Sequence, residues 1–108
     1  MKLPVLALLL LASGAARAGF ESGEMMLHLC QSNASICLAY LEGVVDGAEA
    51  LAWHGVVTGV CVPERVESAE VRQIFLEYAE RQSEILKLPA GMLVIDALRE
   101  AWRCPPQR

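Results

Sequence analysis

Clustered positive charge is missing from this sequence. The chain has 108 residues, with 9 Lys and Arg against 13 Asp and Glu, and a formal net charge of −4 at pH 7. Nucleic-acid binding proteins normally carry a basic face, and no stretch of this chain provides one. Attachment to anionic membrane surfaces depends on the same kind of basic cluster. We therefore expect no nucleic-acid partner and no membrane-surface partner.

Recognisable catalytic and metal-binding motifs are also missing. The two histidines, His28 and His54, do not stand in an H-E-x-x-H or other ligand spacing. The chain has no G-x-S-x-G elbow, no glycine-rich phosphate loop, no C-x-x-C pair and no C-x-x-C-H haem attachment. Asp46 and Asp96 are expected on solvated helix faces rather than as an acid–base pair. We expect no catalytic residue, no metal and no cofactor, and hence no enzyme.

The first 18 residues have the pattern of a secretory signal. A basic residue near the start precedes an apolar run over residues 3–12, and small residues follow, ending in Ala16-Arg17-Ala18. The run is shorter than the roughly 20 apolar residues that span a bilayer. We expect cleavage before Gly19 to release a domain of residues 19–108 that has no membrane segment. Because the signal contains Lys2 and Arg17 but no acid, the net charge then becomes −6.

Four cysteines, all in the expected exported domain, indicate two disulfides. An even number of cysteines in a short exported chain is typical of a disulfide framework, and the spacing is poor for zinc. Four cysteines allow three pairings, and their count alone does not choose between them. The cysteines are Cys30, Cys37, Cys61 and Cys104.

Capping residues and apolar periodicity predict an all-α fold, a small four- to five-helix bundle stapled by the two disulfides. A short first helix is expected to begin at Ser22, which suits an N-cap. The second helix, capped by Asn33 or Ser35, repeats apolar residues in steps of three and four. Gly55 suits the end of this helix. Only the short apolar segment Gly55–Val62 resembles a strand.

Two glycines in the second helix, Gly43 and Gly47, allow two interpretations. Each lowers helix stability by up to about 1 kcal/mol relative to Ala. Their spacing of four residues indicates that another backbone packs closely there. The alternative is that the helix tolerates two poor helix formers, and the sequence favours neither.

The third and fourth helices complete the predicted bundle. The third begins near Ser68, and its far end within Gln82–Lys87 is not defined by the sequence. Pro89 suits the first position of the fourth helix. This helix is apolar over most of its circumference, which indicates a central helix or one that also meets a second subunit. Core positions are favoured for Trp53 and Trp102, with exposed anchors as the alternative.

An up-and-down arrangement of these helices favours one disulfide pairing. Cys30 closes the first helix and Cys37 opens the second, so both lie at one end of the bundle. Cys61 precedes the third helix and Cys104 ends the fourth, so both lie at the other end. We therefore expect the pairs Cys30–Cys37 and Cys61–Cys104.

Two sequence blocks resemble the Rap/Tai family, the immunity proteins of type VI secretion amidase effectors. The segment Cys37-Leu38-Ala39-Tyr40-Leu41-Glu42-Gly43-Val44-Val45-Asp46-Gly47-Ala48 resembles the family pattern Cys-x-x-Tyr-hydrophobic-x-Gly-Val-x-Asp-Ala. The later block Cys61-Val62-Pro63, with Pro89-Ala90, Ala97-Leu98 and Cys104 after it, is also similar. The resemblance extends from Gly23 to Cys104.

The resemblance implies a function in immunity. Such a protein is periplasmic, helical, disulfide-bonded and often a homodimer, and it occludes the active site of a peptidoglycan amidase effector to protect the producing cell. The alternative we consider is a general periplasmic chaperone or stress-response binding protein. The resemblance assigns Tyr40, Gly43 and Asp46 to shaping and packing the second helix.

Loops are the segments best suited to enter an active-site cleft. Two loops of the predicted bundle therefore supply the candidate partner-binding residues. The first loop contributes Trp53, His54 and Val57, and the second contributes Glu84, Leu86 and Lys87.

Overall fold

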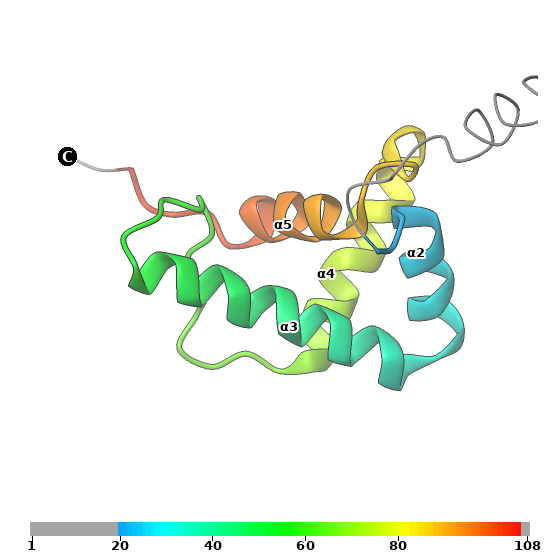
Figure 1. The fold of residues 1–108 in the computed structure, drawn as a ribbon, viewed down its shortest axis with the longest axis horizontal. Coiled ribbons are helices and arrows are strands. Elements are labelled where there is room, and N and C mark those ends of the chain that lie inside the picture. The colour runs from blue at the N-terminus through cyan, green and yellow to red at the C-terminus, as the bar shows by residue number, and fades with distance from the viewer. Residues whose placement is uncertain (1–19, 107–108) are drawn as a thin grey trace, which may run out of the picture.

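Residues 20–106 form a bundle of four α-helices, and these are the residues that the computed structural model describes (Figure 1). The predicted all-α fold is therefore confirmed, whereas the expected signal, residues 1–18, lies outside the described residues. A single 3-10 turn, η1 (Ser83–Ile85), joins the last two helices. The helices are α2 (Gly23–Ser32), α3 (Ala34–Trp53), α4 (Ser68–Arg81) and α5 (Ala90–Ala101).

Side-chain caps define where the first two helices begin. Ser22 Oγ accepts a hydrogen bond of 3.2 Å from the backbone N–H of Met25, as expected for the predicted N-cap. Asn33 Oδ1 accepts one of 3.3 Å from Ile36, and the Asn33 backbone N–H donates to Leu29 O at 2.7 Å. Asn33 therefore ends α2 and starts α3, with no linker between the two helices.

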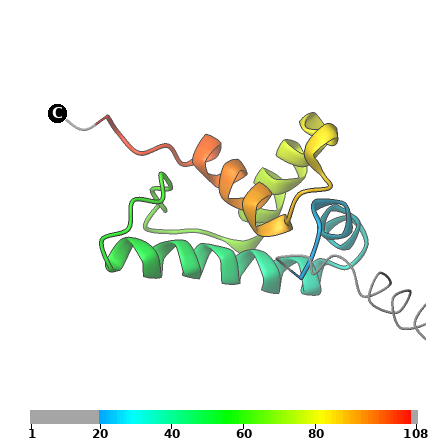
Figure 2. The ribbon, with the colours of Figure 1, turned by 45° about the horizontal axis from the view of Figure 1, so that its top comes forward.

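The helix α5 runs beside α3 and, like each helix of the bundle, contacts the other three (Figures 1 and 2). Burial of five of its residues explains why much of its circumference is apolar, and Met92 is the large apolar side chain that α5 exposes. Pro89 is the N-cap of α5 rather than its first helical residue, one position from the prediction. The buried residues of α5 are Ala90, Leu93, Val94, Ala97 and Leu98.

A close backbone approach occurs at Gly23, at the start of α2. Its N–H donates to Leu88 O at 2.9 Å, and the next residue donates to Leu86 O at the same distance. A Cβ added to Gly23 would overlap the Leu93 side chain and lie 2.8 Å from Leu86 O. Only glycine fits this position without a shift of its neighbours.

The two glycines of α3 pack against nothing. A Cβ added to Gly43 or Gly47 would have no neighbouring atom within 4 Å. Of the two interpretations, tolerance of a poor helix former is therefore correct, and close packing at these positions is not found.

The disulfides join Cys30 to Cys37 and Cys61 to Cys104, which confirms the predicted pairing. Cys30 and Cys37 are completely buried beside the Asn33 junction, and we call residues 30–37 the α2–α3 corner. Cys61 and Cys104 are exposed and link the connection after α3 to the residues after α5. The segment Gly55–Val62 forms no strand: it makes an isolated bridge between Val60 and Arg103.

Candidate functional site

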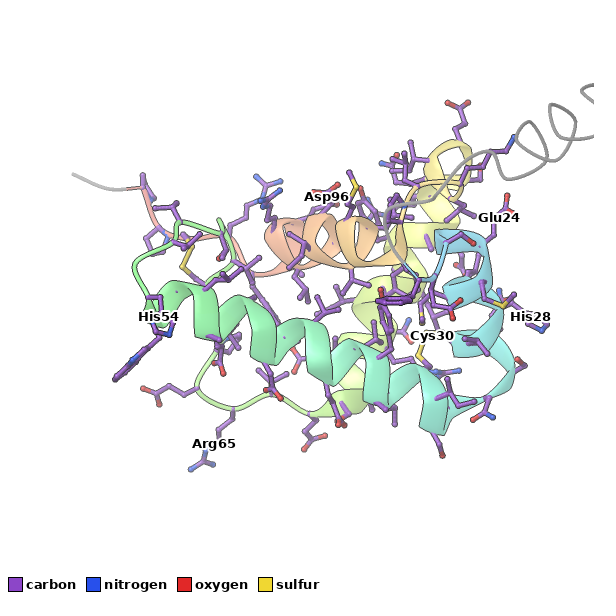
Figure 3. All side chains as sticks on the ribbon, viewed as in Figure 1. Glu24, His28, Cys30, His54, Arg65 and Asp96 are labelled. Carbon is purple, nitrogen blue, oxygen red and sulfur yellow. A yellow bond between two sulfur atoms is a disulfide. The ribbon has the colours of Figure 1, made fainter. Side chains whose placement is uncertain are left out.

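Large apolar side chains are exposed where α3 ends. Trp53 is 88% exposed and Val57 is 90% exposed, and Leu51 and Val56 are about half exposed. The expected core position was therefore wrong for Trp53, whereas Trp102 is buried as expected. Exposed apolar side chains that gather in one region often mark a surface for a protein partner. We call residues 53–60 the α3-end loop, and Figure 3 labels its exposed His54.

The backbone of the α3-end loop is closed by a glycine turn. The His54 N–H donates to Ala50 O at 3.2 Å, and the Val56 N–H donates to Leu51 O at 2.9 Å. Gly55 has a φ of +82°, the left-handed conformation that glycine adopts without strain after a helix. The backbone around Trp53 and Val57 is therefore held by hydrogen bonds in a defined turn.

The side chain of Arg99 fastens the other half of this loop to α5. Arg99 Nε donates to Thr58 O at 2.7 Å, and Nη1 lies 3.2 Å from Asp96 Oδ1. Gly59, with a φ of +77°, brings its backbone against the Arg99 side chain. A loop ordered before binding loses less conformational entropy when a partner engages it.

A groove lies beside this loop, between α3 and the chain that connects α3 to α4. This connection doubles back along α3 (Figures 1 and 2). The groove has a volume of about 260 Å³, and a larger, more open hollow of about 610 Å³ beside Trp53 shares Glu49 and Val62 with it. The groove residues are Glu42, Val45, Asp46, Glu49, Val62, Pro63, Glu64, Val66, Ser68 and Val71.

Negative charge surrounds this groove, which we call the acidic groove. Its four charged residues are all acids, namely Glu42, Asp46, Glu49 and Glu64. Glu42 Oε1 accepts a hydrogen bond from Ser68 Oγ. Within residues 20–106 the ion pairs are Arg81–Glu100 and Arg99–Asp96, so none involves a groove carboxylate. Arg65 is near in sequence but points away from α3 (Figure 3).

The second predicted loop lies on the opposite side of the molecule, in the turn between α4 and α5 (Figure 1). Glu84 and Lys87 are exposed there, but Leu86 is only 9% exposed and packs against the core. Its carbonyl also accepts the hydrogen bond from Glu24. Leu86 therefore cannot present its side chain to a partner, and we leave it out of the candidate surface.

The three residues of the family motif differ in their surroundings. Tyr40 is half-buried, with its hydroxyl against Gly91 at the start of α5. Burial and the nearby Glu21 carboxylate raise the pKa of Tyr40, and a hydrogen bond with the Gly91 backbone opposes them. Tyr40 thus packs α3 against α5. Gly43 and Asp46 are exposed, so the packing role does not extend to them, and Asp46 lines the acidic groove.

Neither a metal cluster nor a membrane span is found in the described part of the chain. No group of three or more His, Cys, Asp or Glu side chains among residues 20–106 could hold a metal ion. No helix in the same range combines the length and apolarity that crossing a membrane requires.

These features define a small helical protein with two disulfides and an exposed apolar loop beside an acidic groove. The chain belongs to the Rap1a immunity protein family, whose family model matches residues 22–104. This match confirms the resemblance drawn from the sequence and indicates an effector immunity protein. Searches of curated proteins and of solved structures gave no match.

Proposed function

We propose that this protein is a periplasmic immunity protein that occludes the active site of a peptidoglycan amidase effector of type VI secretion. In this proposal the signal is cleaved before Gly19, and residues 19–108 act in the periplasm. Membership of the immunity family supports the protective role. The secretory pattern and two disulfides support an oxidising compartment outside the cytoplasm.

The observation that carries the proposal is the exposure of Trp53 and Val57 on a loop held in place by Arg99. A tryptophan side chain that fills a cleft is a frequent source of binding energy at protein interfaces. With the exposed His54 between them in the sequence, these side chains would supply the contact with a concave enzyme site. Occlusion requires no catalytic residue, metal or cofactor from this chain, so the proposed protein is not an enzyme.

Protection of living cells tests this function. A candidate amidase effector is exported to the periplasm of a host, with or without the immunity protein. We expect lysis without the protein and growth with it. The matched control is a chain without residues 2–18, which stays in the cytoplasm and should not protect. Equal lysis with and without the exported protein would contradict the proposal for that amidase.

An activity assay separates occlusion from the alternative function of a general chaperone. Exposed apolar side chains would also serve a chaperone that binds unfolded clients. An occluding protein should abolish peptidoglycan cleavage by the folded amidase at a one-to-one ratio. It should not slow the aggregation of an unrelated unfolded protein. The reverse pair of results would favour the chaperone.

We also propose that the protein forms a homodimer. Most apolar side chains of α5 are buried in the core and are therefore not free to form a dimer interface. The support for a dimer comes instead from exposed apolar side chains on the two segments that are joined by the backbone bridge between Ser22 and Pro89. Light scattering at tens of micromolar should give twice the monomer mass, and Met92→Glu should give the monomer. A monomeric wild-type protein would refute the dimer. The exposed apolar residues of these segments are Phe20, Met25, Leu88 and Met92.

A further inference from the structure

The acidic groove has an apolar floor between two walls that come from different parts of the chain. Val45 on α3 and Val71 on α4 are 8% and 2% exposed and form the deepest part of the floor. Val62 and Val66, on the connection, are half-buried beside them. An aliphatic chain in this groove would therefore contact valine side chains along its length.

The rim of the groove is negatively charged, and within residues 20–106 no basic side chain forms an ion pair with its carboxylates. Asp46 and Glu49 stand on α3, and Glu64 faces the same groove from the connection. Carboxylates that line one groove carry like charge, and a cation placed among them would be attracted to all of them. The nearest basic residue in sequence, Arg65, points outward (Figure 3). Since no ion pair in the described part of the chain engages these carboxylates, the rim is open to a cation from another molecule.

Three arginines of the bundle are held by other partners. Arg72 donates two hydrogen bonds, of 2.8 and 2.6 Å, to Cys30 O at the α2–α3 corner. Arg81 pairs with Glu100, and Arg99 is bound to Thr58 O and Asp96. Local rearrangement of these side chains would break contacts that join separate elements.

We propose that the acidic groove binds a lysine- or arginine-bearing segment of the effector. The aliphatic stem of such a side chain would lie on the valine floor, and its cationic group would meet the rim carboxylates. The identity of the partner rests on the proposed function. The hollow that shares Glu49 and Val62 with the groove reaches Trp53, so one partner surface can contact the groove and the α3-end loop together.

This contact differs in its physical effect from that of the α3-end loop. The loop offers apolar area, which mainly governs how slowly a complex dissociates. A charged groove also speeds association, because opposite charges steer the encounter, and this effect falls with salt. The complex should therefore lose affinity as sodium chloride rises from 50 to 500 mM.

A peptide titration tests the groove without the effector. The probe is a short amidated peptide of alternating lysine and leucine, added to the isotope-labelled mature protein and followed by NMR. We expect shifts at the groove residues, and little effect from the same peptide with glutamate in place of lysine. Shifts elsewhere, or equal binding of the two peptides, would overturn the proposal.

Charge removal provides the matched comparison. Asp46→Asn with Glu49→Gln keeps the shape of the groove but removes charge from two exposed residues, so the fold should be retained. We expect at least about tenfold weaker binding of the lysine peptide. Glu24→Gln with Glu80→Gln, on exposed positions of α2 and α4, removes the same charge elsewhere and should change binding less than about twofold. Equal losses in both variants would overturn the proposal.

The cognate amidase then distinguishes this inference from the proposed function. If the amidase binds the wild type and the groove variant with equal affinity and equal salt dependence, the groove inference fails while the immunity function stands. If the amidase binds neither, the immunity function fails for that enzyme, and the peptide titration still decides whether the groove takes a basic segment.

Discussion

The two disulfides occupy opposite environments. At the α2–α3 corner, Cys30 and Cys37 are completely buried, and Arg72 from α4 donates twice to the Cys30 carbonyl. Just after the α3-end loop, Cys61 and its partner Cys104 are exposed, although the nearby side chains of Val60 and Trp102 are buried. The first disulfide belongs to the core, whereas the second holds a surface loop against α5. One disulfide thus stabilises the packing of the core, and the other positions a candidate binding surface.

The largest expected effect is the loss of the exposed disulfide. Cys61 and Cys104 are 43 residues apart, and in the loop-entropy model a link of this length stabilises by about 4 kcal/mol. Cys61→Ser with Cys104→Ser should lower the free energy of unfolding by about that amount in urea denaturation. Hydrogen exchange should also accelerate in the α3-end loop.

The buried disulfide supplies the control for that comparison. Cys30 and Cys37 are separated by seven residues, for which the same model gives about 2.5 kcal/mol. Cys30→Ala with Cys37→Ala should destabilise the fold. Hydrogen exchange in the α3-end loop, expressed relative to the exchange that global unfolding causes, should stay near the wild-type rate. If the two double variants have the same exchange pattern, the division of roles between the disulfides is wrong.

The second largest effect is expected at Gly23. Gly23→Ala forces a Cβ into Leu93 and the Leu86 carbonyl, and overpacking of this kind costs about 2–3 kcal/mol. We expect a lower midpoint of thermal unfolding and, for the molecules that remain folded, the same affinity for the partner. This pair of results would show that the substitution disturbs the core and not the binding surface. A variant as stable as the wild type would show that this backbone approach is not tight.

The third effect concerns binding rather than stability. Trp53→Ala removes an exposed side chain, so thermal unfolding should barely change. Under the proposed function it should weaken amidase binding by about 30-fold or more, the loss expected for an interface hot spot. Ile36→Ala, at a half-exposed site near the other end of α3, is the matched control for isothermal titration calorimetry. A similar loss for both variants would remove the special role of the α3-end loop.

The smallest effect has the opposite sign. Gly43→Ala places a Cβ in open space on α3 and should stabilise the protein by up to about 1 kcal/mol, because Ala is the better helix former. Urea denaturation of this variant beside Gly23→Ala compares the same chemical change in two environments. A destabilised Gly43→Ala would mean that this face of α3 is covered in solution.

The sequence predicted the features of the fold that depend on local interactions. Ser22 and Asn33 are caps whose partners lie three residues away, so neighbouring residues alone placed the first helix start and narrowed the second to Asn33 or Ser35. The disulfide pairing followed from which helix ends lie together. Pro89 was placed one position too far into its helix, an error within the usual uncertainty of helix boundaries.

Features that depend on distant residues were missed. Gly23 is constrained by Leu86 and Leu93, more than 60 residues away, and no local pattern reveals that contact. For Trp53 the core was favoured over an exposed anchor, although the residue was also named as a candidate for partner binding. It is the last residue of α3 and is 88% exposed.

The acidic groove could be anticipated only in part. Its α3 wall appears in the sequence as acids at positions 42, 46 and 49, which share one face of a helix. The opposite wall, which includes Glu64, depends on the path that the connection takes back along α3. That path is set by tertiary packing, so no periodicity in the sequence describes it.

The exposed disulfide also closes a covalent ring that contains the whole of α4 and α5. The exposed turn around Glu84 and Lys87 lies inside this ring. A protease that cuts the turn once would therefore leave the two fragments joined through Cys61 and Cys104. Thr58 and Arg99 would then lie on different fragments, but the disulfide would hold the fragments together, so the hydrogen bond between these two residues could persist. The ring therefore keeps the chain after the α3-end loop linked to the end of α5 when the turn on the far side of the bundle is cut.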